Sequence, residues 1–590
     1  MCTSSLLHLE RLRDTRGAQR QLIAGSSNQR VSPTTDKVRL RLDAAAASTT
    51  KLQLGEASTN NCSEAMDQGP TKRQKTAEDV LKPLGDDQIK AKHAEYATAA
   101  PYPHVVLRPA VDDATLKSAR REAIHELRAD YKETDLFKVY QVPHDLGTIE
   151  RTAPHLADKA PSLLRVRDAL YSESTRRLVE RITGCGSIGE TVDCSANVYM
   201  RGGHLLCHDD VIGNRLVSFV LYLVDEDWSE GDGGAFELFP MVDGEPSPIP
   251  CKEVACKWNS LLLFKVEPGK SHHAVAEVLG DKPRLTISGW YHAAEQRDGA
   301  AARASSLGQL RVAEARPFTN FDGDEDEDDV EKPLSSEDLS ALASWVAPAY
   351  LDPKAWPRLR EHFANDSAAR LVDFCCASVA SEVAQAEKAG SHDNWRVVGP
   401  PHKRRYCVPQ GDSDLGRALA KIEHGASSAA FRRLLARITG VRPVARDSTI
   451  RRFRPGRDYT VAVSGDPVPV IDATFCFLGS NSEEWASGEV GGFETYIEAE
   501  DEGDADAAVY DGDAGEGGDE GGDLLSVEAQ HNCLSIVLRD PGTLRFVKYV
   551  SAFAPSARCD VEVVCRIHDE DLPDPDDDGG DSDGDGDEEG

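Results

Sequence analysis

The sequence places a histidine and a carboxylate two residues apart, at His208 and Asp210, directly after the strand-like segment HLLC. Residues i and i+2 of a β-strand point to the same face, so these side chains can converge while Asp209 points away. One imidazole, one carboxylate and a second histidine form the facial triad of non-haem iron sites, which leaves coordination positions open for reactants. An HxD motif is common by chance, so this interpretation depends on further residues at matching spacing.

The third ligand is expected from a later strand that folds back beside the first. His272 and His273, in the segment HHAVAEV, are the two main options. Neighbours on a strand face opposite sides, so one of the two can be the ligand. Spacing alone does not say which of the two is the ligand, so the sequence leaves both histidines open as the third metal ligand.

Three more polar residues lie at positions where a 2-oxo acid would need them. Arg284 lies eleven residues after His273 in the strand-like segment RLTISGW. Its guanidinium can hold a carboxylate through two parallel hydrogen bonds. Thr286 lies on the same strand face, and Tyr199 lies nine residues before His208, so each can add a hydroxyl. This pattern predicts Fe(II) and 2-oxoglutarate as cofactors.

The elements around these residues predict a barrel supported by helices. Helical spacing of apolar residues covers 111–130 and 162–183, and eight short strand-like segments follow from residue 194. This order predicts a double-stranded β-helix, or jelly roll, in a mainly β, α+β fold. Phe219, Leu221, Leu223 and Leu263 are expected to line the barrel and shield its interior.

The second half of the chain repeats this layout. Helical segments at 356–389 and 415–439 precede six strand-like segments, beginning with DYTVAVSG and ending with CDVEVVCRI. A tandem pair of barrels is therefore expected. The second lacks an HxD motif, and Lys548 and Tyr549 occupy the region where a distal histidine would be needed. We expect it to be non-catalytic.

Composition shifts predict the domain boundaries. Residues 1–88 are expected to be a disordered tail, with a basic cluster at 70–75 that could act as a nuclear localisation signal. The catalytic domain is expected at 89–299, an acidic linker at 300–335, and the second barrel at 336–567 with an acidic insertion at 499–523. An acidic disordered tail is expected at 568–590.

Bulk composition narrows the class of partner. The chain has 590 residues, a formal net charge of −34 and 14 cysteines without a CxxC pair. The charge disfavours nucleic acid and anionic membranes and favours basic partners. No stretch approaches the ~18 apolar residues that cross a bilayer, and we expect no signal peptide. Scattered cysteines favour reduced thiols, and the expected location is the nucleus, the cytoplasm or both.

Several segments resemble one known family. The resemblance lies in LLCHDDVIGNRLVSFVLYLVDEDW, the following Gly-Gly turn and SHHAVAEVLGDKPRLTISGWYH, and continues in WVAPAYLDP, GPPHKRRY, GGFETYI and LRDPGTLRFVKYV. These segments are similar to the ribosomal prolyl hydroxylases, which are 2-oxoglutarate oxygenases. The resemblance covers about residues 102–567, apart from the acidic insertions.

This resemblance implies tandem double-stranded β-helix domains of which the first is catalytic. It implies iron ligation by His208, Asp210 and His273, which chooses between the two histidines, and 2-oxoglutarate binding by Arg284 and Tyr199. The implied reaction converts 2-oxoglutarate and O2 to succinate and CO2 while a prolyl residue is hydroxylated, with ascorbate as the reductant.

The implied substrate is a basic small-subunit ribosomal protein, hydroxylated at the decoding centre, with an effect on translation accuracy or termination. Two alternatives remain open. The same chemistry could act on another protein target, or the chain could be a regulatory binding scaffold in the hypoxia response or in transcription-factor turnover.

Overall fold

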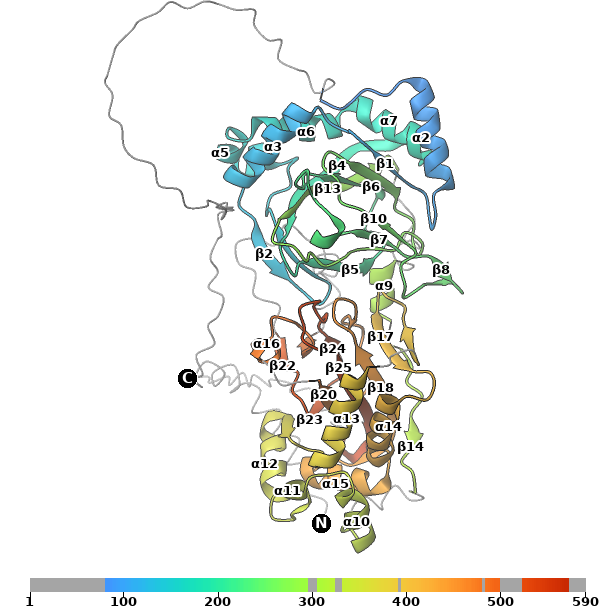
Figure 1. Ribbon diagram of the computed structural model, residues 1–590, viewed down its shortest axis with the longest axis vertical. Coiled ribbons are helices and arrows are strands. Elements are labelled where there is room, and N and C mark those ends of the chain that lie inside the picture. Colours follow the sequence, from blue (N-terminus) through green and yellow to red (C-terminus); the bar gives the residue numbers. More distant parts are fainter. Residues whose placement is uncertain are drawn as a thin grey trace, which may run out of the picture. The chain divides into compact units, whose positions relative to one another are not determined.

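The computed structural model describes residues 80–295, 305–312, 314–323, 332–390, 394–479, 483–498 and 523–571. The described chain divides into two compact units with a boundary between Gln309 and Leu310, here called the N-terminal and C-terminal units (Figure 1). The basic cluster at 70–75, most of the predicted acidic linker run and nearly all of the predicted acidic insertion and tail lie outside the described residues. No helix within these ranges has the length and apolar character needed to span a membrane.

Within its described residues, the N-terminal unit is built on one eleven-stranded antiparallel sheet. The order is β1-β11-β6-β13-β4-β3-β5-β12-β7-β10, and β2 pairs with β3. The strands are β1 His104–Leu107, β2 Asp130–Glu133, β3 Phe137–Gln141, β4 Ile188–Tyr199, β5 His204–His208, β6 Arg215–Tyr222, β7 Phe236–Leu238, β10 Lys252–Val254, β11 Leu261–Lys265, β12 His273–Val275 and β13 Arg284–Ala293. A separate hairpin joins β8 Met241–Val242 to β9 Glu245–Pro246. The sheet curls into the predicted jelly roll, which confirms the fold class.

Helices cover one face of this sheet (Figure 1). They are α2 Asp86–Thr98, α3 Asp113–Glu126, α4 Ile149–Thr152, α5 Pro154–Ala157, α6 Pro161–Tyr171 and α7 Glu173–Thr183. The predicted helix at 162–183 is two helices, because Ser172 ends α6 and its hydroxyl caps α7 by accepting from the Thr175 amide. Folded structure also begins before the predicted boundary at residue 89, since Val80 is fully buried and Leu81 bridges to Val111.

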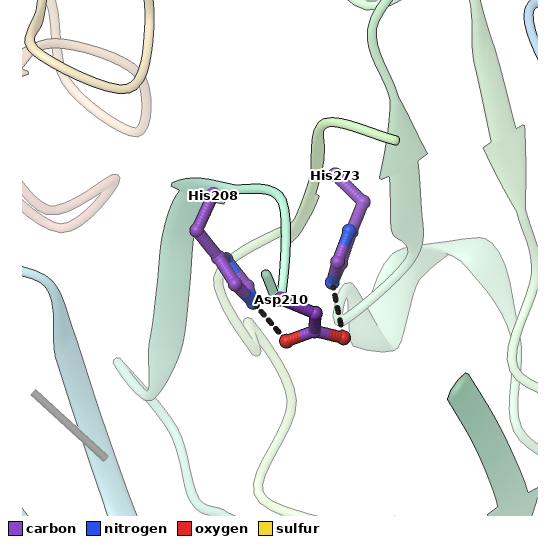
Figure 2. A group of neighbouring side chains, drawn as sticks. All are labelled: His208, Asp210 and His273. Carbon is purple, nitrogen blue, oxygen red and sulfur yellow. Dashed lines mark ion pairs between the residues drawn. The ribbon is translucent and has the colours of Figure 1, made fainter. Parts of the chain in front are cut away.

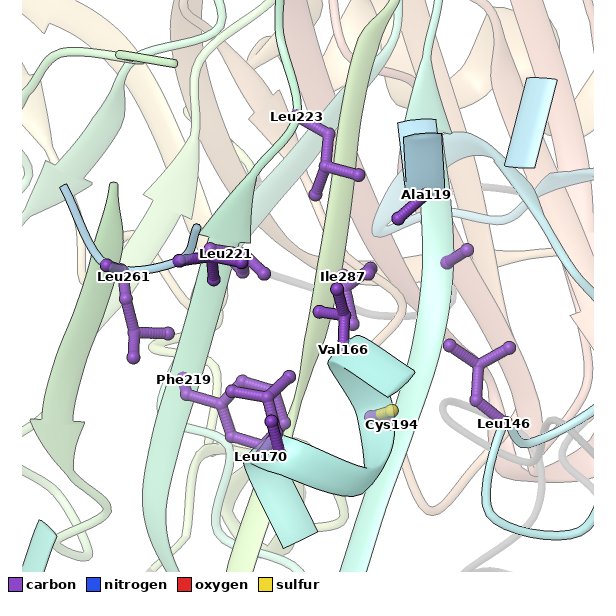
Figure 3. Close-up of a cluster of buried hydrophobic side chains, with 14 of the residues drawn as sticks. Ala119, Leu146, Val166, Leu170, Cys194, Phe219, Leu221, Leu223, Leu261 and Ile287 are labelled. Atoms are coloured by element: carbon purple, nitrogen blue, oxygen red, sulfur yellow. The ribbon is translucent and has the colours of Figure 1, made fainter. Parts of the chain in front are cut away.

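Strand β6 is buried on both faces, and its alternating side chains enter two different cores. Phe219, Leu221 and Leu223 belong to the core between the sheet and the helices, where Val166 and Leu170 of α6 meet them (Figure 3). The expectation that these three residues line the barrel is therefore wrong. Leu263 also lies in this outer core. The interior wall is instead formed by the alternate positions, which are Val220, Tyr222, Val224, Leu262 and Phe264, together with Tyr102, Tyr199 and Phe236.

The C-terminal unit contains a nine-stranded and a three-stranded antiparallel sheet among its described residues. The larger has the order β15-β23-β20-β25-β18-β17-β16, with β14 and β19 paired at its side, and the smaller has the order β22-β21-β24. The strands are β14 Thr319–Asn320, β15 Ala368–Val372, β16 Trp395–Val398, β17 Arg404–Pro409, β18 Pro443–Phe453, β19 Tyr459–Thr460, β20 Val470–Leu478, β21 Glu494–Glu498, β22 Asp523–Val527, β23 Cys533–Arg539, β24 Thr543–Val547 and β25 Arg558–Ile567. Of the predicted strand DYTVAVSG, the short β19 alone is present.

The helices of the C-terminal unit depart from the prediction at two places. They are α10 Ser336–Ala343, α11 Pro348–Leu351, α12 Trp356–Asp366, α13 Ala377–Ala389, α14 Asp414–Ala426, α15 Ala429–Thr439 and the short α16 Glu483–Ser487. The predicted segment at 415–439 is two helices, because Ser428 caps a new helix by accepting from the Phe431 amide. The predicted helix at 356–389 is interrupted by strand β15. Helix α12 ends at Ser367, which adopts a left-handed backbone conformation and redirects the chain into that strand. A last short turn, Asp569–Asp571, belongs to the predicted tail but is packed, because Asp571 pairs with Arg442.

A repeated helix supports the duplication of the two units. Helix α7 ends in RRLVERITG and α15 in RRLLARITG, seven of nine residues being identical. Each helix is capped by a serine, Ser172 or Ser428, and each ends at a left-handed glycine, Gly184 or Gly440. This signal was readable in the sequence, although the prediction of a tandem fold rested on element order instead.

Candidate metal centre and co-substrate site

The structure brings His208, Asp210 and His273 together inside the N-terminal barrel (Figure 2). His208 closes β5 and His273 opens β12, and the two are direct partners in the strand register. Asp210 Oδ1 lies 3.1 Å from His208 Nε2, and Asp210 Oδ2 lies 3.4 Å from His273 Nε2. One potential ligand atom from each residue lies within 4.8 Å of the others, and all three residues are buried. Among the described residues, no other group of three such side chains is this close.

Asp210 reaches this position through a turn, not through strand alternation. Strand β5 ends at His208, and Asp210 has a φ of +61°, in the left-handed region that aspartate tolerates better than most residues. The predicted convergence therefore occurs, but its predicted cause is wrong. The Ser218 hydroxyl donates to Asp210 Oδ2 over 2.7 Å and helps to fix the carboxylate.

Backbone carbonyls orient both histidine rings. The Leu206 carbonyl lies 2.8 Å from His208 Nδ1, and the Ser271 carbonyl lies 2.8 Å from His273 Nδ1. A carbonyl can accept but cannot donate, so both Nδ1 atoms carry a proton. This leaves the two Nε2 lone pairs directed at Asp210, which is the tautomer that a metal needs.

The electrostatics of the cluster favour a bound cation. Burial opposes ionisation of Asp210, but His273 and His208 outweigh it and hold the pKa of the carboxyl well below its usual range. Burial likewise opposes protonation of His208, yet the Asp210 carboxylate raises the pKa of that imidazole. The three groups thus attract positive charge strongly, and two neutral imidazoles with one carboxylate suit a divalent metal that retains open positions.

His272 lies outside the cluster. Its side chain is fully buried, and burial, with His273 and His208 nearby, lowers its pKa to about 3. Its backbone carbonyl accepts from the Tyr102 hydroxyl and the Phe239 amide. The structure therefore places His273, the residue that the resemblance favours, beside the other two ligand candidates.

Aromatic rings shield the metal cluster. Phe236 stacks on His273 with ring centroids 4.9 Å apart, and Phe264 meets the same imidazole edge-on at 4.7 Å. Apolar walls around three polar ligands exclude bulk water and strengthen electrostatic interactions inside the barrel.

Arg284 presents a buried guanidinium to the same interior. Its side chain is 1% exposed, and Nε donates to the Gly234 carbonyl over 2.7 Å and lies 3.3 Å from Cys256 Sγ. Its Nη2 has no hydrogen-bond partner, and no carboxylate within the described ranges pairs with it. Gly234 has a φ of +69°, and a Cβ there would lie 2.7 Å from Arg284 Cδ, so glycine is required beside the arginine.

This arginine fits the far carboxylate of 2-oxoglutarate. A buried cation without a counterion is costly, and a bound dicarboxylate would supply that counterion and the missing hydrogen bonds. Tyr199 is the strand partner of Arg284, with its ring 5.1 Å from the guanidinium carbon. Burial raises the pKa of Tyr199 to about 12, so the phenol stays protonated and can donate. Thr286 is 1% exposed and lies two residues after Arg284 on the same strand.

Tyr222 is a site residue that the sequence analysis missed. It is fully buried, its ring lies 5.2 Å from the Arg284 guanidinium carbon, and Thr286 is its partner in the strand register. The signal was available, because Tyr222 alternates along β6 with the residues that face the helices.

The C-terminal unit repeats the frame that holds Arg284. Arg558 opens β25 as Arg284 opens β13, and its Nη1 donates to the Gly492 carbonyl as Arg284 Nε donates to Gly234. Both glycines follow another glycine and have positive φ, +72° and +69°. The two frames can therefore be compared residue by residue.

Strand register identifies the third ligand position in the second frame. Counting equally from the Gly-Gly turn, His273 pairs with Leu238 in β7, and Arg545 pairs with Tyr496 in β21. Arg545 also bridges to Val463, in the segment that corresponds to β5. Arg545 is thus the counterpart of His273.

The other two ligand positions lack suitable side chains. Val463 and, two residues later, Gly465 stand where the N-terminal unit has its first histidine and its aspartate. The expectation that Lys548 or Tyr549 occupies the distal position is wrong, because the register assigns it to Arg545. None of these three counterparts is a side chain that Fe(II) prefers.

Buried carboxylates neutralise the arginines of the C-terminal unit. Arg545 lies 2.6 Å from Glu494 and 3.5 Å from Asp472, and Arg558 lies 3.2 Å from Glu494 and 3.0 Å from Asp560. All five residues are buried or nearly so. The further buried pairs of this network are Arg451–Asp560, Arg451–Glu562 and Arg539–Asp472.

Two family models match the chain. A 2OG-Fe(II) oxygenase superfamily model covers residues 194–292, and a model described as the C-terminal domain of oxoglutarate and iron-dependent oxygenase degradation covers 337–572. A prolyl 3,4-dihydroxylase OGFOD1 from Ostreococcus tauri is 36% identical over 497 residues, which are 79% of this chain and 95% of that protein. A prolyl 3-hydroxylase OGFOD1 from Xenopus laevis is 28% identical, over 77% of this chain and 84% of that protein. The crystal structure of a Pseudomonas putida prolyl-4-hydroxylase shares 20% identity over 35% of this chain and 98% of that one, with a TM-score of 0.26.

The chain therefore belongs to the 2-oxoglutarate- and Fe(II)-dependent prolyl hydroxylases. It is a peptidyl-proline dioxygenase with Fe(II) and 2-oxoglutarate as cofactors. The His-Asp-His cluster and the buried arginine fit these two cofactors chemically.

Proposed function

We propose that the cofactors are held by side chains of β4, β5, β12, β13 and the turn after β5: Fe(II) by His208, Asp210 and His273, and 2-oxoglutarate by Arg284, Tyr199 and Thr286. The observation that carries this assignment is the buried guanidinium of Arg284, which has an unpartnered Nη2 inside the barrel that holds the triad. Bound Fe(II) supplies O2 activation coupled to decarboxylation of 2-oxoglutarate. The protein side chains orient the co-substrate, keep open metal positions and exclude water.

The proposed substrate is a prolyl residue of a small-subunit ribosomal protein at the decoding centre, whose hydroxylation influences translation accuracy or termination. Two curated relatives are named for prolyl hydroxylation, and the motifs around the HxD and the last strand are similar to those of ribosomal prolyl hydroxylases. A protein that binds ribosomal RNA is basic, and a chain of net charge −34 attracts it at long range.

The test is mass spectrometry of the decoding-centre protein from cells with and without this chain. We expect a prolyl residue with one or two added oxygen atoms that disappears when the chain is deleted and returns with the wild-type chain. Cells that carry Asp210→Ala provide the matched control and should lack the modification. An unchanged prolyl residue in all of these cells would contradict the ribosomal substrate, while iron-dependent succinate formation would still support the oxygenase.

Two smaller proposals accompany this function. Ascorbate is the proposed reductant, and it should sustain repeated turnover by the purified enzyme better than a thiol at equal reducing capacity. The proposed location is the nucleus, the cytoplasm or both, where ribosomal proteins are made and assembled. Fluorescence microscopy of the tagged full-length chain, beside a variant without residues 70–75, tests the location and the role of the basic cluster.

A further inference from the structure

Asp209 lies between two of the proposed metal ligands but points away from them. It is 1% exposed, and no Lys, Arg or His side chain in the described ranges forms an ion pair with it. A buried carboxylate of this kind must be satisfied by hydrogen bonds, because an unsatisfied buried polar group strongly destabilises the fold.

The Asp209 carboxylate accepts hydrogen bonds from three separate segments of the chain. It accepts from the amides of Val211 at 3.3 Å, Gly269 at 3.2 Å and Ser306 at 3.1 Å, and from the Ser306 hydroxyl at 2.9 Å. Ser306 begins the short helix α9, Ser306–Leu310, which lies in the region predicted as a linker. Ser306 is nevertheless buried, 6% exposed, so the start of that region is part of the N-terminal unit.

The backbone of Asp209 connects the same network to the other metal ligand. Its carbonyl accepts from the Ser271 hydroxyl over 3.1 Å, and the Ser271 carbonyl holds Nδ1 of His273 at 2.8 Å. A continuous set of hydrogen bonds therefore runs from Ser306 through Asp209 to both segments that carry the ligand side chains. Contacts behind the ligands of a metal site commonly tune metal affinity.

We propose that Asp209 is a positioning residue for the metal centre, and that Ser306, after the catalytic barrel, completes the site by anchoring the ligand turn. The inference rests on the proposed metal assignment. The strand register keeps His208 and His273 opposite each other, but Asp210 lies in a turn outside the strands. The Asp209 contacts hold that turn together with the Ser218 hydroxyl, so their loss should let the Asp210 carboxylate move away from the histidines.

The experiment measures Mn(II) binding to the full-length protein by electron paramagnetic resonance of the free ion, with Mn(II) as a redox-stable probe of the Fe(II) site. His208→Ala defines complete loss of the site. Asp209→Asn should weaken Mn(II) binding about 10- to 100-fold, the range typical for contacts behind a ligand. Asp281→Asn is the matched control, because Asp281 is 91% exposed, and it should bind as wild type.

Two further variants separate positioning from loss of charge. Ser306→Ala keeps the Asp209 charge and should still weaken Mn(II) binding several-fold, whereas Ser306→Thr keeps the hydroxyl and should bind nearly as wild type. The double variant Asp209→Asn/Ser306→Ala should bind Mn(II) no more weakly than Asp209→Asn, since both changes disrupt the same contact between residues 209 and 306. Circular dichroism of the metal-free proteins checks that each variant is folded.

Wild-type Mn(II) affinity in folded Asp209→Asn and Ser306→Ala would overturn the proposal and restrict this contact to holding α9. Independent, additive losses in the double variant would also overturn it. If His208→Ala retained Mn(II) affinity, the metal assignment itself would fail, which is a distinct outcome. Turnover is not needed for any of these measurements, so an incorrect ribosomal substrate would not affect them.

Discussion

The two units share a frame but satisfy its buried arginine in opposite ways. In the N-terminal unit, Arg284 has an unpartnered Nη2 and no carboxylate partner among the described residues. In the C-terminal unit, the corresponding Arg558 pairs with Asp560, which stands at the position of Thr286, and with Glu494. The first barrel thus leaves the place of the counterion to a ligand, and the second fills it with its own side chains.

The metal position shows the same contrast. His273 in the N-terminal unit corresponds to Arg545 in the C-terminal unit, and the aromatic Phe236 that stacks on His273 corresponds to Glu494. Where the N-terminal unit has a cluster that can bind a cation, the C-terminal unit has a permanent internal cation, the Arg545 guanidinium, paired with carboxylates. The same barrel can therefore be a binding site or a closed scaffold, according to whether its interior charges are left without partners or are paired by its own side chains.

The largest expected effect comes from removing Asp210, the one carboxylate among the three proposed metal ligands, whose position in the second barrel is occupied by Gly465. Asp210→Ala should abolish 2-oxoglutarate turnover, because it removes one of three protein ligands and the only charged one, while leaving the fold intact. Succinate formation with a proline peptide measures turnover, and circular dichroism measures folding. Asp227→Asn, at an exposed carboxylate, is the control. Wild-type turnover by folded Asp210→Ala would refute the assignment.

A paired substitution compares the two arginines directly. Arg284→Lys should raise the 2-oxoglutarate concentration needed for half-maximal rate by about tenfold or more, because lysine cannot reproduce a bidentate contact and one hydrogen bond to a charged group contributes ~1.5–3 kcal/mol. Arg558→Lys should leave that requirement unchanged. Steady-state kinetics on both proteins provide the measurement, and equal shifts in the two variants would remove the distinction between the barrels.

Breaking the internal pairs should destabilise the C-terminal unit. Glu494→Gln leaves the buried guanidinium groups of Arg545 and Arg558 partly uncompensated, at a cost of about 3–5 kcal/mol in the free energy of unfolding. Urea unfolding followed by circular dichroism measures the loss, and Mn(II) identifies the N-terminal transition by shifting it. Glu528→Gln, at a half-exposed ion pair with Arg370, should cost no more than about 1 kcal/mol.

Acid should also destabilise the C-terminal unit more than the N-terminal unit. Burial alone would raise the pKa values of Glu494, Glu562 and Asp472, but neighbouring guanidinium groups, including Arg545, hold these pKa values below their usual range. Carboxyls with depressed folded pKa values stabilise fully above their unfolded values near ~4, and this stabilisation is lost as pH falls below them. The urea midpoint of the C-terminal transition should therefore fall more steeply between pH 5 and pH 3 than the N-terminal one, to be measured in parallel titrations.

The smallest expected effect concerns the phenol beside Arg284. Tyr199→Phe keeps the ring over the guanidinium but removes one hydroxyl donor, so 2-oxoglutarate binding should weaken by about 1–2 kcal/mol, or roughly 5- to 30-fold. Isothermal titration with 2-oxoglutarate and Mn(II) measures this loss. Tyr131→Phe, at an exposed tyrosine, should show no change, and an unaltered affinity in Tyr199→Phe would place the co-substrate elsewhere.

The sequence was most informative where chemistry requires particular side chains at fixed spacing. His208, Asp210 and a later histidine could be found in this way, and the structure brings them together. What spacing could not reveal was the left-handed turn at Asp210, because backbone dihedrals at a strand end depend on tertiary contacts such as those of Asp209. The choice of His273 likewise needed the register of β12 against β5.

Other predictions failed because the sequence did not show which face of a strand a side chain occupies, or which distant strands pair. Strand β6 is apolar at six of its eight positions, so the pattern did not show that Phe219 faces the helices and Tyr222 the barrel. The role of Arg545 could not be read from its neighbours, because its partners come from β20, β21 and β25. Local sequence does not encode which distant strands lie side by side.

The internal ion pairs also limit how the second barrel could change during evolution. Replacing Arg545 alone by histidine would leave Glu494, Glu562 and Asp472 without one of their cationic partners. Such a single step is strongly destabilising, and it still yields one metal ligand out of three. A return to metal binding therefore requires several simultaneous substitutions, because a single one unpairs buried charge before a complete set of ligands exists.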